Sequence, residues 1–146
     1  MDEIRPWLYI GKYRDTLNKA YLESRSIRAM LQLAEKVEHP GITSLYLPVE
    51  DLEPISSKLI KQGTDFILEE KQKGHRLLVA CGAGINRSSA FCIVALIETE
   101  GLSLMNAFKE VKRKHPEAMP HKPVWESLCK YYGEWIPHLD IMRFGI

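Results

Sequence analysis

The architecture of this chain follows from one segment, Leu77-Leu78-Val79-Ala80-Cys81-Gly82-Ala83-Gly84-Ile85-Asn86-Arg87-Ser88. Its apolar first half predicts a buried strand that ends at Cys81, and the apolar residues after Ser88 predict a helix. Gly82 and Gly84 lie in the short loop between the two, where a tight turn and close approach to a ligand both favour glycine. The segment therefore predicts a strand, a loop and a helix in direct succession, with a cysteine at the base of the loop.

The loop also has the composition of a phosphate-binding site. A tight turn can direct several backbone N–H groups at one anion, and the N-terminus of the following helix adds its positive end. Arg87 contributes a planar guanidinium that can hold two phosphate oxygens at once. We therefore predict a phosphate-binding loop (P-loop) made of Gly82, Ala83, Gly84, Ile85, Asn86 and Arg87.

Cys81 is the predicted nucleophile of this site. The positive groups of the loop and the helix favour the thiolate, which is the form of cysteine that attacks phosphorus. Ser88 can donate to the sulfur and stabilise it when it later becomes a leaving group. The alternative is that Cys81 is a small apolar core residue, as most isolated buried cysteines are. The glycines, Arg87 and Ser88 around it favour catalysis.

Length and composition limit the classes of protein that the chain can represent. With 146 residues, 45% hydrophobic and 27% charged, we expect one domain, residues 1–146, with a proper core. A net charge of +1 implies no bulk attraction to nucleic acid or to a membrane, and we expect a monomer. Met1-Asp2-Glu3 opens no signal peptide, which favours a cytoplasmic location. The 3 cysteines form no CxxC pair and no zinc spacing, so we expect reduced thiols, no metal and no cofactor.

Hydrophobic periodicity and turn residues predict the remaining elements. Strands are expected at residues 7–10, 27–33, 43–49 and 76–80, and helices at residues 13–24, 54–73, 88–100, after Ser103, and 122–135. This order predicts an α/β fold: one central, mostly parallel sheet of four to five strands flanked by helices, with the P-loop between a central strand and a helix. Open α/β sheets bind ligands at the carboxyl edge of their strands, where this loop would lie.

The segment from Cys81 to Ser88 resembles the Cys-x5-Arg-Ser/Thr signature of the small dual-specificity phosphatases in the protein tyrosine phosphatase superfamily. The likeness covers nearly the whole chain. Residues 4–11 look like the opening strand of that family, residues 47–51 like the segment of its general acid, and residues 107–128 like its closing helices. The resemblance implies a cysteine-dependent phosphatase that hydrolyses phosphotyrosine and phosphoserine/threonine in a phosphoprotein or phosphopeptide, through a cysteinyl-phosphate and without metal.

Two features depart from the pattern of that family. Ala80 stands where most members have the histidine that helps to orient the loop and its cysteine. The loop is also small and uncharged at Gly82, Ala83 and Ile85, where some lipid phosphatases carry lysine, so the resemblance does not extend to inositol lipids.

The resemblance assigns the general acid to Asp51. A carboxylic acid beside the loop protonates the departing oxygen and then acts as base for the attacking water. In the alternative interpretation, Asp51 only caps a helix that starts near Pro54. Glu50 is the nearest substitute for the acid, and Asp65 is expected to lie exposed in the middle of a helix.

Several other residues have two interpretations. Asn86 either bonds within the loop or tolerates a left-handed conformation there. The run Lys112-Arg113-Lys114-His115 either contacts a second phosphate or, as we prefer, completes a helix C-terminus with cations. The histidines are expected mostly at the surface, and Trp7, Trp125 and Trp135 in or beside the core.

Three alternative functions remain open on the sequence. A non-catalytic phosphate-binding module of the same fold would need neither the nucleophile nor the acid, and the intact Cys81 argues against it. Sulfur transfer and arsenate reduction also use a loop cysteine, but Cys92 and Cys129 are not placed as a thiol relay. An RNA 5′-triphosphatase would favour a basic groove, which the near-neutral charge does not suggest.

Overall fold

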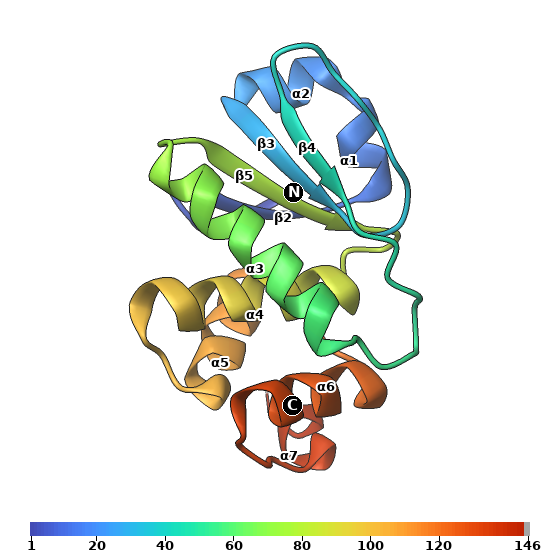
Figure 1. The fold of residues 1–146 in the computed structure, drawn as a ribbon, viewed down its shortest axis with the longest axis vertical. Coiled ribbons are helices and arrows are strands. Elements are labelled where there is room, and N and C mark those ends of the chain that lie inside the picture. The colour runs from blue at the N-terminus through green and yellow to red at the C-terminus, as the bar shows by residue number, and fades with distance from the viewer. Residues whose placement is uncertain (145–146) are drawn as a thin grey trace.

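Residues 1–144 are described by a computed structural model, in which five strands form one mixed sheet (Figure 1). The strand order is β1 (Asp2–Arg5), β2 (Leu8–Lys12), β5 (Arg76–Cys81), β3 (Ile27–Gln32) and β4 (Thr43–Tyr46). The edge strand β1 runs antiparallel to β2, and all other pairs are parallel. The predicted α/β fold with a mostly parallel sheet is confirmed.

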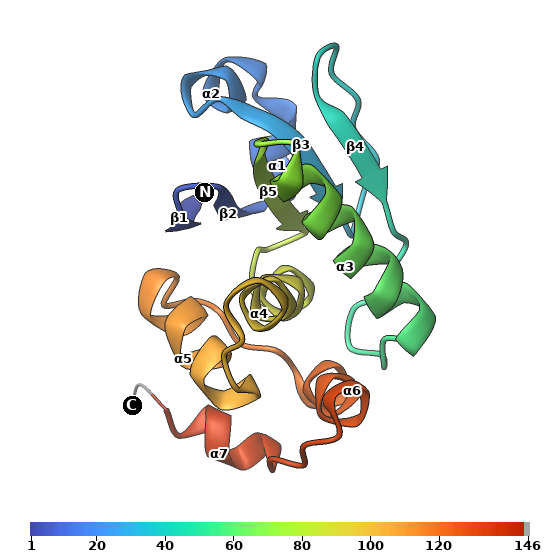
Figure 2. The same cartoon turned by 60° about the vertical axis from the view of Figure 1, so that its left-hand side comes forward.

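Alternate residues of the central strand β5 build two separate cores on the two faces of the sheet. Leu77, Val79 and Cys81 belong to the larger apolar cluster, whereas Leu78 and Ala80 belong to the smaller one. Figure 2 shows the helices that cover each face. The smaller cluster lies under α1 (Tyr13–Leu17) and α2 (Lys19–Ser24). The larger cluster lies between the sheet and α3 (Ser57–Gln72), α4 (Arg87–Glu100) and α5 (Leu104–Lys114). It extends to α6 (Lys122–Tyr132) and α7 (His138–Met142), which pack beyond α4 and α5.

Helix α4 is the centre of the larger core. Every residue from Ser88 to Leu96 is buried, which the apolar composition of the segment predicted. Gly101 ends the helix in the left-handed conformation (φ = +67°), where glycine avoids the strain that a Cβ would cause. Ser103 caps the next helix, as expected, because its Oγ accepts from Asn106 N–H at 3.1 Å. The sheet and α4 together fix both ends of the loop of residues 82–87.

Several element boundaries differ from the expectations. The helix expected at 13–24 is split at Asn18, whose side chain caps α2 by accepting from Tyr21 N–H at 3.0 Å. The helix expected from Pro54 begins later, because Ser56 is its cap. The last predicted helix ends at Tyr132, one residue before a left-handed Gly133, and α7 follows. The hydrophobic pattern alone did not predict β1, since Ile4 is its only buried residue.

Helices α3 and α4 approach closely at Gly63, and this contact predicts a stability effect. A Cβ at Gly63 would overlap the ring of Phe91, which is fully buried and cannot swing away. Alanine normally favours a helix over glycine by about 1 kcal/mol. Overpacking costs about 1–3 kcal/mol and here outweighs that gain. We expect Gly63→Ala to lower the free energy of unfolding by about 1–2 kcal/mol in urea denaturation. The exposed neighbour Gln62→Ala is the control, and equal stability of both variants would contradict the close contact.

Residues 1–144 contain neither a membrane-crossing helix nor a cluster of metal-ligating side chains. No helix in this range has the length and hydropathy required to cross a bilayer. No group of three or more His, Cys, Asp or Glu side chains in this range is arranged to hold a metal ion.

Candidate active site

Cys81 is the last residue of β5 and lies at the base of the loop of residues 82–87. Its thiol is buried, and Ser88 at the far end of the loop closes onto it. The Ser88 Oγ lies 3.1 Å from the Cys81 Sγ, and the Ser88 N–H donates to the same sulfur at 3.4 Å. The loop thus begins and ends at one sulfur atom, which accepts from the Ser88 N–H in the first turn of α4 and lies beside the Ser88 hydroxyl.

The other two cysteines lie in helices rather than in the loop. Cys92 is fully buried in α4, and burial raises the pKa of its thiol. Burial also raises the pKa of Cys129 in α6. Both thiols therefore stay protonated and packed in the core, as the sequence predicted.

The backbone N–H groups of the loop are free. Within residues 1–144, none of the N–H groups of residues 82–87 donates to a protein acceptor. Their carbonyls, by contrast, are held from outside. The Gly82 carbonyl accepts from Tyr13 N–H at 3.3 Å, and the Ile85 carbonyl accepts from Met119 N–H at 3.0 Å and from Ser89 Oγ at 2.6 Å. Because C=O and N–H point in opposite directions from a trans peptide, the free N–H edges point away from these partners and are available to an anion.

Gly84 has the backbone conformation that the loop requires of a glycine. Its φ is +71°, a region that residues with side chains rarely adopt. A Cβ at this position would also approach the carbonyl oxygen of Gly11 to 3.0 Å. The second glycine of the motif therefore serves both the turn and the contact with β2.

Arg87, the first residue of α4, donates hydrogen bonds to the protein through one of its three guanidinium nitrogens. Its Nη1 donates to the carbonyls of Val49 at 2.8 Å and Leu33 at 3.3 Å. Its Nε is buried and, among the described residues, has no hydrogen-bond partner. A buried unpaired donor beside the free N–H groups is costly unless a ligand satisfies it. The Nε edge of the guanidinium is thus available for an oxyanion.

Asp51 reaches this site from the loop after β4. Its Oδ1 accepts from Asn86 Nδ2 at 2.7 Å and lies 3.6 Å from Arg87 Nε, and its side chain is 50% exposed. The second oxygen, Oδ2, has no protein partner among the described residues. The capping alternative for Asp51 is excluded, because Ser56 caps α3. Glu50 is exposed, and Asp65 is exposed in mid-helix beside Lys61, as expected.

Asn86 connects the acidic loop to the C-terminal half of the chain. Its φ of −93° lies in the right-handed region, so a left-handed conformation is not the reason for asparagine here. Its Nδ2 donates to Asp51, and its Oδ1 accepts from the backbone N–H of His121 at 2.7 Å. The bonds made by Asn86 therefore orient a neighbouring carboxylate rather than the loop alone.

A segment that the sequence analysis did not single out supports the loop from behind. We call residues 115–121, between α5 and α6, the support segment. Its members His115, Met119 and His121 bond to Gly84, Ile85 and Asn86 in turn. Two of these bonds involve the backbone of the segment, so no side-chain pattern could have indicated them.

Three further expectations are tested by burial and contacts. His115 is buried, not at the surface. Lys112 donates to the Ala118 carbonyl and Arg113 pairs with Glu110, so these two cations have structural partners. Trp125 is buried, but Trp135 is 67% exposed and the expectation of a core position for it was wrong.

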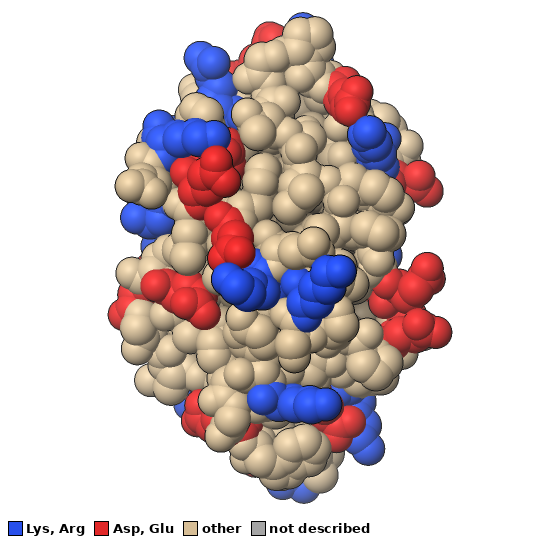
Figure 3. Space-filling model, in the orientation of Figure 1, with Lys and Arg blue, Asp and Glu red and all other residues tan. Residues whose placement is uncertain are grey.

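Ala80 packs in the smaller cluster, on the sheet face opposite to Cys81. A depression of about 370 Å³ borders the loop and is lined by Lys12, Tyr13, Arg14, Gly82, Ala83, Ile85 and Glu117. On the face shown in Figure 3, basic and acidic side chains are interspersed rather than separated.

Comparison with known proteins identifies similar sequences. The family model of the dual specificity phosphatase catalytic domain matches residues 8–134. The human dual specificity protein phosphatase 5 is 30% identical over 139 residues, which cover 92% of this chain and 36% of that protein. The chain spans about a third of the length of this curated relative.

Solved structures resemble the fold over almost its full length. The crystal structure of human DUSP28 has a TM-score of 0.81 and 26% identity, covering 91% of this chain and 96% of the other. The human tyrosine phosphatase-like serine/threonine/tyrosine-interacting protein has the same TM-score of 0.81 and 26% identity, covering 91% and 95%.

Proposed function

This chain belongs to the dual specificity phosphatase family, and on that premise we propose that it hydrolyses phosphomonoesters of phosphoproteins or phosphopeptides through a cysteinyl-phosphate. One observation carries the proposal: the loop that follows a single buried thiol has free backbone N–H groups and a buried guanidinium nitrogen without a hydrogen-bond partner. The proposal assigns catalysis to one domain, residues 1–146, without metal. The second candidate function is a non-catalytic phosphate-binding module. The likeness to a tyrosine phosphatase-like interacting protein supports this candidate.

In the first step, the Cys81 thiolate attacks phosphorus while the ester oxygen leaves. The S–P bond forms as the P–O bond breaks, and the N–H groups of residues 82–87 and Arg87 bind the three non-bridging oxygens. Asp51 donates its proton to the leaving oxygen from Oδ2, while Asn86 keeps Oδ1 in place. The products of this step are the alcohol or phenol and the phosphorylated enzyme.

In the second step, water replaces the sulfur. The Asp51 carboxylate takes one proton from the water as its oxygen attacks phosphorus, and the S–P bond breaks. The Ser88 hydroxyl, 3.1 Å from the sulfur, donates to the departing thiolate. Inorganic phosphate leaves, and Asp51 is again protonated for the next cycle.

We expect Asp51→Asn to lower kcat by about a hundredfold for a phosphothreonine peptide, whose alkoxide needs a proton to leave. The loss should be much smaller for p-nitrophenyl phosphate, because p-nitrophenolate leaves readily without one. The asparagine retains an oxygen for Asn86, so the loop keeps its geometry. Steady-state rates with both substrates measure the difference.

Glu50→Gln is the matched control for Asp51→Asn. Glu50 precedes Asp51 and is exposed, and its substitution should leave both rates within about twofold of wild type. The opposite result, with Glu50→Gln as the impaired variant, would transfer the acid role to Glu50.

The covalent intermediate tests the proposal directly. A peptide with a ³²P-labelled phosphotyrosine is mixed with enzyme and quenched in denaturant at alkaline pH, where the P–S bond is most stable, and the labelled residue is located by peptide mapping. We expect label on Cys81. An enzyme with no turnover and no label would instead be the non-catalytic phosphate-binding module.

The substrate range needs a separate measurement. The match to the dual specificity phosphatase catalytic domain supports acceptance of both short and long phosphorylated side chains. We expect matched peptides that differ only in phosphotyrosine or phosphothreonine to be hydrolysed at rates within about a hundredfold, a difference of less than 3 kcal/mol in activation free energy. Strict selectivity for one of them would contradict dual specificity.

A further inference from the structure

His115 is a buried, titratable side chain that takes no part in the reaction steps proposed above. It is 3% exposed and caps the C-terminus of α5. Its Nε2 lies 2.7 Å from the Gly84 carbonyl in the loop, and its Nδ1 lies 2.6 Å from Asp2 Oδ2 in β1. A single ring thus connects the edge strand of the sheet to the middle of the loop.

We propose that His115 is a positioning residue, whose imidazolium, clamped by Asp2, holds the Gly84–Ile85 peptide so that the Ile85 N–H faces the bound phosphate. The inference rests on the proposed function for its role in catalysis. His115 is far from the loop in sequence, yet in this proposal it determines the direction of one N–H donor to the phosphate.

The partners of the ring determine its protonation. A backbone carbonyl can only accept, so Nε2 carries a proton and donates to Gly84. The Asp2 carboxylate also accepts, so Nδ1 donates as well. The geometry of these two contacts thus points to the imidazolium form of the ring.

The Gly84–Ile85 peptide depends on this one contact. Within residues 1–144, the Gly84 carbonyl has no partner other than His115. Glycine at position 84 permits many backbone conformations, so the peptide could otherwise rotate. Because C=O and N–H oppose each other, a carbonyl held towards α5 directs the Ile85 N–H to the other side, where the remaining free N–H groups lie.

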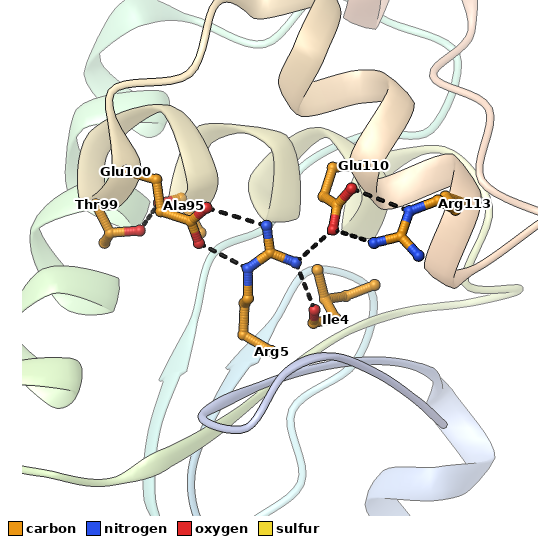
Figure 4. Close-up of polar contacts among 7 residues, drawn as sticks. All are labelled: Ile4, Arg5, Ala95, Thr99, Glu100, Glu110 and Arg113. Carbon is orange, nitrogen blue, oxygen red and sulfur yellow. Dashed lines mark hydrogen bonds and ion pairs between the residues drawn. The ribbon is translucent and has the colours of Figure 1, made fainter.

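The strand that carries Asp2 is itself held against α4 and α5. Figure 4 shows Arg5 of β1 between Glu100 at the end of α4 and Glu110 of α5. Arg5 Nε donates to Glu100 Oε2 at 2.7 Å, and Nη1 donates to Glu110 Oε1 at 2.7 Å. The hydrogen bond with Glu100 raises the pKa of Arg5, so this contact keeps its charge. Arg5–Glu110 and Asp2–His115 therefore attach β1 to α5 at two points, which places the Asp2 carboxylate beside the ring.

Three variants separate positioning from general stability. His115→Phe keeps a ring of similar size and removes both donors. The pair His115→Gln with Asp2→Asn replaces the charged contact by a neutral one, because the glutamine amide can donate to Gly84 and accept from the asparagine. The control is His75→Gln, which breaks a similar histidine–carboxylate pair with Glu70 (2.8 Å) just before β5, at the opposite end of the strand from the loop.

Each variant is measured for kcat and KM with p-nitrophenyl phosphate, for the inhibition constant of vanadate, and for Tm. Removal of a direct oxyanion donor costs about 10²–10³ in kcat, and a misdirected donor should cost less, about tenfold. We expect His115→Phe to lower kcat about tenfold and to raise the vanadate inhibition constant by a similar factor. The double variant His115→Gln/Asp2→Asn should recover most of the wild-type kcat and of the wild-type vanadate inhibition. His75→Gln should change neither kcat nor the vanadate inhibition constant.

The possible outcomes are distinct. A lower Tm for His115→Phe with unchanged kcat and vanadate inhibition would reduce His115 to a structural residue and overturn the inference. If His115→Phe fails to fold, the single variant His115→Gln decides, since without Asp2→Asn its amide oxygen faces the carboxylate. The single variant should have a lower kcat and a higher vanadate inhibition constant than the double variant. Equal values of kcat and of the inhibition constant in the two variants would also overturn the inference. The ¹⁵N signals of His115 should show two protonated nitrogens, and one unprotonated nitrogen would contradict the imidazolium.

Failure of the proposed function would be recognised separately. In that case wild type would show no turnover that depends on Cys81. Calorimetric binding of vanadate to the loop would still compare wild type with His115→Phe, and weaker binding by about tenfold would support the positioning role alone.

Discussion

Replacing Cys81 by serine is expected to lower kcat by at least about four orders of magnitude. The serine hydroxyl is not ionised at neutral pH, and within residues 1–144 the hydrogen-bonding neighbours of the Cys81 sulfur are the Ser88 hydroxyl and its N–H, neither of which is a base. Nothing therefore replaces the lost nucleophilicity. The free N–H groups and Arg87 remain, so the variant should still bind phosphate and vanadate. Rates with p-nitrophenyl phosphate, together with calorimetric binding of vanadate, test both halves of this expectation.

Cys92→Ala provides the matched control for the cysteine substitution. Burial raises the pKa of Cys92, so its thiol stays protonated, and it lies in α4 rather than at the loop. We expect unchanged kcat and a small loss of stability from the vacated volume. Residual turnover of Cys81→Ser near the wild-type rate would show that another group attacks phosphorus, and the mechanism would have to be abandoned.

Arg87→Lys is expected to lower kcat by about a hundredfold or more. The guanidinium uses Nη1 for the carbonyls of Val49 and Leu33 and leaves its Nε edge for two phosphate oxygens. A lysine has one nitrogen, which cannot occupy both positions. A lysine at position 87 would therefore lose either the contacts with the loops after β3 and β4 or the contact with the phosphate. The vanadate inhibition constant should rise together with the fall in kcat, since the same edge holds both oxyanions.

Arg113→Lys controls for the change from guanidinium to ammonium. Arg113 is exposed and pairs with Glu110 on the surface of α5, where either cation suffices. The kcat of the Arg113→Lys variant should equal that of the wild-type protein. If Arg87→Lys were equally active, the guanidinium could not be the group that binds the transition state.

The segment from Leu77 to Ser88 could be interpreted from sequence because its determinants are local. Consecutive apolar residues, two glycines and a long apolar run each act within a few residues of chain, and β5, the loop and α4 appeared at nearly the expected positions. The edge strand β1 was missed by the hydrophobic pattern because one face of an edge strand meets little of the core. The position of Trp135 was missed because hydrophobicity alone does not exclude exposure.

The support segment could not be predicted for a different reason. Its bonds to the loop join residues about thirty positions apart, and two of them use backbone groups that every residue possesses. Asn86 illustrates the same limit: its type suggested turn geometry, but its contacts with Asp51 and His121 depend on where two distant segments meet. The local pattern predicted the position of the loop and its conformation, whereas the residues that orient it could be found only from the tertiary structure.

The support segment also has a consequence for the order in which this protein folds. A nascent chain that ends before residue 115 already contains β5, the loop and α4, yet it lacks the bonds to Gly84, Ile85 and Asn86. Contacts of such long sequence separation are entropically expensive and form late. The geometry that we propose for oxyanion recognition therefore forms only after the C-terminal helices have docked, and an incomplete molecule released early would contain Cys81 without that geometry.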